Sequence, residues 1–284
     1  MIVALQYHKG DRERTLALVK LLADIESSPR NDILLALVCQ SDTPPSNLTE
    51  SALQYCSLKF PTIHVIIPQR GGGHPEGPGL LWAGTMEYFH KLFEQKLTSH
   101  DSVMTLDGGD GVPLHRSWID LTIEEHAKTL KNKKLITGTP SPQDPIAYCP
   151  LHVNPNAIFH LSIWNKEPSL CTIPKSNGTL FNHFDIYHRR IMLNNASLSS
   201  VIKTDWRGNG KHINPNLMQR EAARAVWLHG YKDDDLYSIA REHLLAPESV
   251  SPNIQRYQLS ELYMIESCRR APERLTPCPD CVKA

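Results

Sequence analysis

Short apolar runs alternate with longer amphipathic stretches along most of this chain, and this alternation constrains the fold most strongly. The short runs are rich in β-branched residues and are typical of buried strands. The longer stretches carry apolar residues at helical spacing. Strands are predicted at residues 1–7, 32–39, 64–68, 102–106, 135–139 and 152–159, and helices at residues 12–25, 80–95, 118–131, 181–194 and 235–245.

The alternation of strands with helices predicts an α/β fold, with a mostly parallel, doubly wound sheet and helices on both faces. A length of 284 residues suits one large domain or two modest ones. Because the end of the chain is rich in proline, we expect a main domain at residues 1–247 and a C-terminal extension at residues 248–284.

Charge and cysteine content limit the classes of function. Thirty basic residues balance thirty acidic ones, which argues against a protein that coats nucleic acid through bulk positive charge. The longest apolar runs, such as residues 33–38, are too short to span a bilayer. The first residues lack the basic segment of a signal peptide, and seven cysteines are an odd number. We therefore expect a cytoplasmic protein with reduced thiols and no membrane span; its oligomeric state is left open.

Polar clusters follow several of the predicted strands. In an open α/β sheet, ligands bind outside the carboxyl ends of the strands, so these clusters indicate one ligand crevice. The clusters are Tyr7-His8-Lys9, Arg70 with the glycines 71–73, Asp107 to Asp110, and Asn154-Pro155-Asn156.

The acidic cluster has the chemistry of a cation site. Asp107 and Asp110 flank two glycines directly after an apolar strand. Two carboxylates on a tight turn can reach one divalent cation, and oxygen ligands suit Mg²⁺ or Mn²⁺. A plain Asp-Gly turn without a ligand is the alternative.

Two further segments favour a phosphate ligand beside that cation. His229 follows an apolar run and offers a third metal ligand, while Lys232 offers an ammonium to a diphosphate. The alternative for this segment is a charged surface turn. Arg70 and the loop around Gly72 precede a predicted helix, whose N-terminus and backbone N–H groups suit phosphate oxygens. Together these segments predict a metal-bound nucleoside diphosphate.

The order of these motifs resembles the GT-A-fold glycosyltransferases of the nucleotide-diphospho-sugar transferase superfamily. The resemblance covers roughly residues 1–245. It consists of the first strand, the aspartate turn followed by VPL, Trp118, the H-x-N-x-N segment, and a late HGxK element similar to that of glycogenin-like enzymes. It implies a GT-A-like fold and an Asp-x-Asp motif that holds Mn²⁺ or Mg²⁺ on the diphosphate of a nucleotide sugar.

The resemblance also implies roles for individual residues. Asp107, Asp110 and His229 match the metal ligands, with Asp110 the stronger match of the two aspartates. Lys232 matches the diphosphate lysine. The positions that match nucleotide-side residues or the segment near donor sugar and acceptor are Tyr7, Asp11, Asn154 and Asn156.

Two departures from the family pattern stand out. The spacing D-G-G-D is one residue longer than Asp-x-Asp, which leaves open whether Asp107 belongs to the ligand set. Pro155 stands where related proteins carry glycine, and it stiffens that backbone.

In glycosyl transfer, negative charge grows on the leaving diphosphate and must be stabilised. The cation and Lys232 would supply this stabilisation. If the reaction inverts the anomeric configuration, a carboxylate must act as base, and Asp185 is the candidate. If the reaction retains configuration, Asp185 would instead orient the sugar. A helix-surface carboxylate without a role is the alternative for this residue.

We therefore expect a metal-dependent glycosyltransferase that uses a nucleotide-diphosphate sugar, with a UDP-sugar the first choice. The expected acceptor is a glycan, with a modified nucleic-acid base as the second candidate. A non-catalytic glycan- or nucleic-acid-binding module on the same fold remains an alternative. A sugar-phosphate nucleotidyltransferase is disfavoured, because such enzymes carry a long Gly-rich loop after the first strand, where this chain has YHKGD.

Other conspicuous residues receive simpler interpretations. Trp82 and Trp118 are expected to pack helices, and the segment around Trp206 and Arg207 is expected to form an acceptor-facing loop. A zinc site at the end of the chain would lack a fourth ligand beside Cys268, Cys278 and Cys281.

Overall fold

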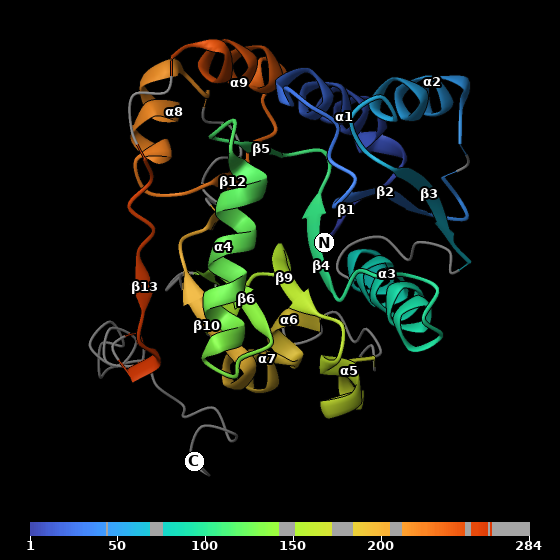
Figure 1. The fold of residues 1–284 in the computed structure, drawn as a ribbon, viewed down its shortest axis with the longest axis vertical. Helices are drawn as coiled ribbons and strands as arrows, with labels where there is room; N and C mark the ends of the chain where they lie inside the picture. Colours follow the sequence, from blue (N-terminus) through green and yellow to red (C-terminus); the bar gives the residue numbers. More distant parts are fainter. Residues whose placement is uncertain are drawn as a thin grey trace.

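A mixed sheet of eight strands forms the centre of the molecule (Figure 1). The computed structural model describes residues 1–43, 45–68, 76–141, 151–171, 184–204, 212–247, 251–260 and 262. The strands of the sheet are β1 (Ile2–Tyr7), β2 (Leu34–Gln40), β3 (Thr62–Ile67), β4 (Ser102–Asp107), β6 (Ile136–Gly138), β9 (Ala157–His160), β10 (Ala196–Ser199) and β13 (Arg256–Tyr257). Their order across the sheet is β13-β10-β6-β9-β4-β1-β2-β3.

Most of these strands run parallel, and β9 is the exception that matters for the site. Strands β4, β1, β2 and β3 lie side by side in that order and run parallel to one another. Strand β9 runs antiparallel to both β4 and β6. The amino end of β9 therefore lies beside the carboxyl end of β4.

Two smaller sheets and the helices complete the described structure. Strands β11 (Ile202–Thr204), β12 (Trp227–His229) and β5 (Gly111–Pro113) form one sheet, and β7 (Pro140–Ser141) pairs with β8 (His152–Val153). The helices are η1 (Lys9–Asp11), α1 (Arg12–Ile25), α2 (Asn47–Cys56), α3 (Glu76–Glu94), α4 (Trp118–Lys131), α5 (Ile163–Lys166), η2 (Pro168–Cys171), α6 (Phe184–Tyr187), α7 (Arg189–Asn195), α8 (Pro215–Ala222) and α9 (Leu236–Leu245).

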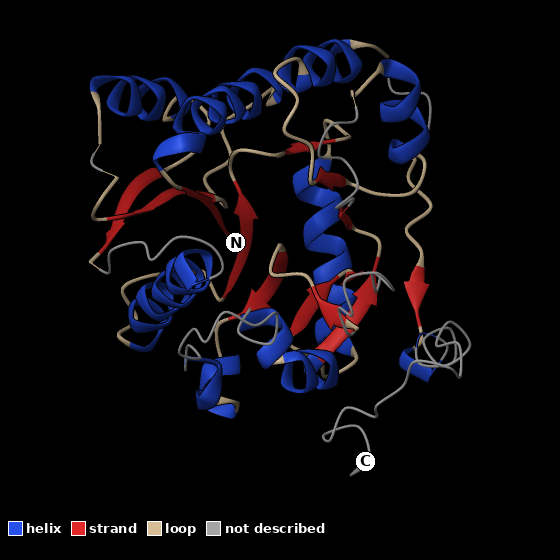
Figure 2. Cartoon of the chain, turned by 180° about the vertical axis from the view of Figure 1, so that it is seen from behind, coloured by secondary structure: helices blue, strands red, loops and turns tan. Residues whose placement is uncertain are grey.

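Helices cover both faces of the sheet, as the sequence predicts (Figure 2). Alternate residues of β1 enter two separate cores, because successive side chains of a strand point to opposite faces. Val3 and Leu5 pack with α1, α2, α4, α8 and α9, whereas Ile2 and Ala4 pack with α3, α5 and α7. Trp82 and Trp118 are buried in these cores, so their interpretation as packing residues is confirmed.

Helices α1 and α4 begin and end at the predicted residues, whereas α2, α5 and α8 were not predicted. The fully buried residues of helix α2 are Thr49 and Cys56, whereas Leu48 is exposed. The positions of its apolar residues therefore do not indicate which face of the helix is buried. Asn214 precedes α8 as its N-cap, and its side chain accepts the Leu217 N–H. Asparagine followed by proline is a signal for the start of a helix that the sequence itself carries here.

Two predicted elements are divided. The strand predicted at 152–159 is interrupted, and β8 and β9 are separated by Asn154-Pro155-Asn156. The helix predicted at 181–194 consists of α6 and α7 within the described residues, and residues 181–183 lie outside them.

The segment after residue 250 contacts the main sheet. Strand β13 pairs with β10, and Arg256 donates two hydrogen bonds to the buried Glu125 carboxylate on α4, at 3.0 and 2.7 Å. The boundary between residues 247 and 248 stays a prediction. No helix in the described ranges is long and apolar enough to cross a membrane.

Candidate metal and nucleotide site

Three short segments bring the predicted metal ligands together. Asp107 is the last residue of β4, and Asp110 immediately precedes β5. Strand β5 pairs antiparallel with β12, with Gly111 opposite His229. The Asp110 carbonyl also accepts the N–H groups of Gly230 and Tyr231, at 3.0 and 3.1 Å. This register places His229, more than a hundred residues away in sequence, against the aspartate turn.

The two glycines of the turn allow it to lie directly on helix α1. A Cβ atom on Gly108 would lie 2.6 Å from Cγ2 of Thr15, and one on Gly109 would lie 2.6 Å from Cβ of Asp11. A Cβ atom essentially never comes this close to a heavy atom to which it is not bonded, so the turn excludes side chains at both positions. The close packing of the turn on α1 therefore explains why both residues between the two aspartates are glycines.

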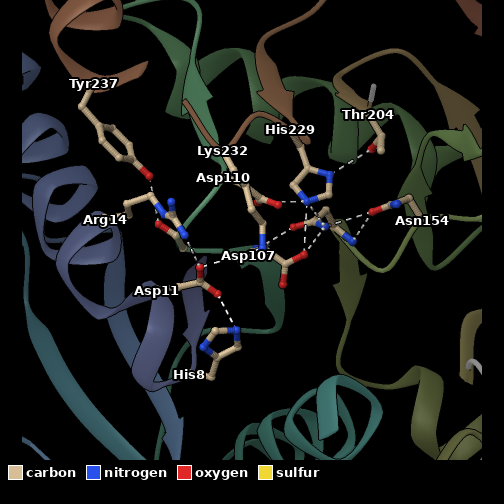
Figure 3. A network of polar contacts seen from close by, with 12 residues as sticks. His8, Asp11, Arg14, Asp107, Asp110, Asn154, Thr204, His229, Lys232 and Tyr237 are labelled. Atoms are coloured by element: carbon tan, nitrogen blue, oxygen red, sulfur yellow. Dashed lines mark hydrogen bonds and ion pairs between the residues drawn. The ribbon is translucent and has the colours of Figure 1, made fainter. Parts of the chain in front are cut away.

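The three candidate ligands converge on one point (Figure 3). Nε2 of His229 lies 3.1 Å from Oδ2 of Asp107 and 3.1 Å from Oδ1 of Asp110. The imidazole is fully buried, and the Asp107 side chain is half exposed. Asp110 Oδ1 is buried and makes no hydrogen bond despite its closeness to the imidazole. A buried carboxylate oxygen in this state fits a cation ligand.

The electrostatics of the cluster favour positive charge at its centre. Burial by itself would lower the pKa of His229, but the carboxylates of Asp110 and Asp107 outweigh it and raise the pKa to about 10. Burial would raise the pKa of Asp107, but the hydrogen bond and charge of His229 lower it. A proton on His229 and a bound divalent cation are therefore alternatives at the same place.

Two polar residues support this cluster, and the sequence analysis missed one of them, Thr204. Nδ1 of His229 lies 3.4 Å from Oγ1 of Thr204, which the parallel β11–β12 pair places beside it. Asn156 contacts Asp107 and His229 directly, and its predicted place near the donor sugar stays a prediction. No local sequence signal marks Thr204, because its position depends on strand pairing.

Three basic side chains surround Asp11, next to the aspartate turn. Asp11 precedes α1 but makes no capping bond; its carboxylate contacts His8 at 2.8 Å, Arg14 at 2.9 Å and Lys232 at 3.9 Å (Figure 3). The Lys232 side chain is nearly half exposed. Arg14 was not predicted, although it lies three residues after Asp11 on the same helix.

Tyr7 is buried at the end of β1. Its hydroxyl lies 3.0 Å from Nε2 of His64, and burial raises its pKa. Its predicted part in nucleotide binding stays a prediction.

Asp185 is buried on α6, so the alternative of a helix-surface carboxylate is wrong. Its Oδ2 lies 3.2 Å from Nε2 of His152, and its Oδ1 accepts the Ile186 N–H at 3.0 Å. Residue His152 is on β8, two positions before Asn154, which links this pair in sequence to the residues around the metal cluster. A catalytic role for Asp185 stays a prediction.

Several predicted residues lie outside the described part of the chain. They are Arg70, Gly72, Trp206, Arg207, Cys268, Cys278 and Cys281.

Comparisons with known proteins show the fold. No protein-family model matches the sequence, and no curated protein matches it. The galactosyltransferase LgtC, in complex with donor and acceptor sugar analogs, superposes with a TM-score of 0.52 at 10% identity over 88% of this chain and 98% of that chain. The bifunctional glycosyltransferase WbbM gives a TM-score of 0.51 at 12% identity over 93% of this chain, but only 51% of its own. The chain has a GT-A glycosyltransferase fold, and the predicted fold class is confirmed.

Proposed function

We propose that this protein is a metal-dependent glycosyltransferase that moves a sugar from a nucleotide-diphosphate donor to an acceptor hydroxyl. The observation that carries the proposal is the convergence of Asp107, Asp110 and His229 at the carboxyl end of β4, within a GT-A fold. Ligands of open α/β sheets bind at such strand ends. We propose a UDP-sugar as the donor and a glycan as the acceptor.

Asp107, Asp110 and His229 would hold Mn²⁺ or Mg²⁺. When bound, such a cation supplies positive charge to the diphosphate oxygens on which negative charge grows as the sugar leaves. Lys232 is partly exposed and lies three residues after His229, so its ammonium can leave Asp11 for the leaving diphosphate. Positive charge at this place would stabilise the transition state more than the bound donor.

The acceptor side of the reaction depends on Asp185. In an inverting reaction, its carboxylate would take the proton of the acceptor hydroxyl while the oxygen attacks the anomeric carbon. The adjacent His152 can hold that carboxylate in position through their 3.2 Å contact. In a retaining reaction no such base is needed, and Asp185 would orient the donor sugar. Asp185→Asn distinguishes these roles, since the loss of a base changes the pH profile of the reaction.

The proposal is tested by incubating the protein with a panel of nucleotide sugars and Mn²⁺ and measuring the released nucleoside diphosphate by chromatography. We expect slow hydrolysis of one donor, which Asp110→Ala abolishes while circular dichroism shows an intact fold. Asp120→Ala is the control, because this exposed carboxylate on α4 pairs only with Arg30 among the described residues. Full activity of Asp110→Ala would overturn the site. Binding of UDP without release from any donor would favour the non-catalytic alternative.

A further inference from the structure

Asn156 connects two strands at the candidate cation site. It immediately precedes β9, whose first residue, Ala157, pairs with Thr105 of β4. Because β9 runs antiparallel to β4, Asn156 lies beside the end of β4, where Asp107 is found. The Asn156 side chain is buried. It therefore makes its contacts with protein groups rather than with bulk water.

The orientation of the Asn156 amide is determined by its neighbours. Its Oδ1 accepts the backbone N–H of Asp107 at 2.6 Å, and a backbone N–H only donates. Its Nδ2 must then lie on the other side, 3.2 Å from Oδ2 of Asp107, 3.0 Å from Oδ1 of Asn154 and 3.1 Å from Nε2 of His229. Oδ1 of Asn154 is identified in the same way, because it accepts the backbone N–H of Asn156 at 2.8 Å.

Asn156 thus holds Asp107 at two points, its backbone and its carboxylate. Asp107 needs this support, since its side chain is half exposed and follows a strand end next to two glycines. Within the described residues, its carboxylate hydrogen-bonds only with Asn156 and His229. Without Asn156, cation binding would have to order a carboxylate that is otherwise free to turn toward water.

We propose that Asn156 is a positioning residue that holds Asp107 in the cation site. Through this contact, the D-G-G-D turn supplies two carboxylates to one centre although it is one residue longer than Asp-x-Asp. The inference rests on the proposed function, because it concerns the same cation. It assigns Asn156 to the metal ligand Asp107 rather than to the sugar of the donor.

The test measures Mn²⁺ affinity of the full chain by titration calorimetry, without a nucleotide. Residues that hydrogen-bond to metal ligands typically contribute about 10- to 100-fold to the affinity for the metal. We therefore expect Asn156→Ala to weaken Mn²⁺ binding by about tenfold. Asn156→Ser is the second variant; its short hydroxyl keeps the site polar but cannot reach the Asp107 carboxylate. Asn165→Ala is the control, because this exposed asparagine contacts Glu94 on the surface.

A double-mutant cycle separates positioning from a structural role. If Asn156 acts through Asp107, the double variant Asn156→Ala/Asp107→Ala binds Mn²⁺ no more weakly than Asp107→Ala alone. Unchanged affinity in both Asn156 variants would overturn the inference, even if their thermal stability falls. A tenfold loss that persists in the Asp107→Ala background would overturn it as well. Failure of the unaltered protein to bind Mn²⁺ would overturn the cation site itself and this inference with it.

Discussion

Cation binding at the candidate site depends on the protonation state of His229. Its imidazole is fully buried between two carboxylates, and both raise its pKa. Only the neutral imidazole offers a lone pair to a cation, so protons and metal ions compete for the same nitrogen. Thr204 beside Nδ1 leaves Nε2 directed at the aspartates.

This competition predicts that Mn²⁺ binding strengthens as the pH rises. A group with a raised pKa, here about 10, keeps its proton at neutral pH, and the cation must displace it. Affinity should rise by up to about tenfold per pH unit between roughly pH 6 and pH 8, once carboxylates are ionised. Calorimetry in buffers of different ionisation enthalpy should detect release of about one proton. In His229→Gln, both the slope and the proton release should be lost; an affinity of the unaltered protein that does not vary with pH would contradict the expectation.

Among the elements, the turn between β4 and β5 depends most on close packing. Both of its glycines touch the first turn of α1, and the Tyr237 hydroxyl of α9 donates to the Gly108 carbonyl at 3.2 Å. The position of Asp110 is thus set by two helices as well as by its own strands.

Gly109→Ala should therefore separate the turn from α1. The added Cβ would meet Cβ and Cγ of Asp11, which cannot move without moving the start of the helix. We expect a loss of about 1–3 kcal/mol in the free energy of unfolding, together with weaker Mn²⁺ binding. Urea denaturation and calorimetry measure the two effects.

Gly10→Ala is the matched control for this variant. Its Cβ would meet only the tip of the His8 side chain, which can turn away. Its loss should stay below about 1 kcal/mol. Equal losses in the two glycine variants would contradict the packing argument.

At the scale of the whole molecule, residues 251–257 are attached to the main sheet and to α4. The Ser200 N–H donates to the Gln255 carbonyl at 2.8 Å, and Arg256 pairs with Glu125, whose side chain is almost fully buried. These contacts suggest that the segment unfolds together with the sheet.

Arg256→Ala tests this cooperativity. It removes two hydrogen bonds from a buried carboxylate, so we expect the free energy of unfolding to fall by about 1–2 kcal/mol, with one urea transition retained. Arg190→Ala, at an exposed position of α7, should leave the midpoint unchanged. A separate early transition in the unaltered protein would instead show that the segment unfolds independently.

The sequence was sufficient for much of the fold and for the three candidate ligands. The spacing of apolar residues within one segment shows which face of a helix or strand is buried. This spacing predicted α1, α4 and the central strands. It failed for α2, which exposes much of its apolar surface, and for the strand at 152–159, which Asn154-Pro155-Asn156 interrupts. It left the membership of Asp107 in the cluster open, because spacing alone does not show how a turn packs.

By itself, the sequence determined which chemistry this chain carries: two carboxylates on a glycine turn, a late imidazole and a lysine, each at the end of an apolar run. Only the tertiary structure decided that they meet, with Nε2 of His229 and Oδ2 of Asp107 3.1 Å apart across 122 positions of sequence. The physical reason is the distance along the chain over which each interaction acts. Side-chain type and local spacing act over a few residues, whereas the β5–β12 register, the antiparallel direction of β9 and the contact of the turn with α1 depend on the whole chain.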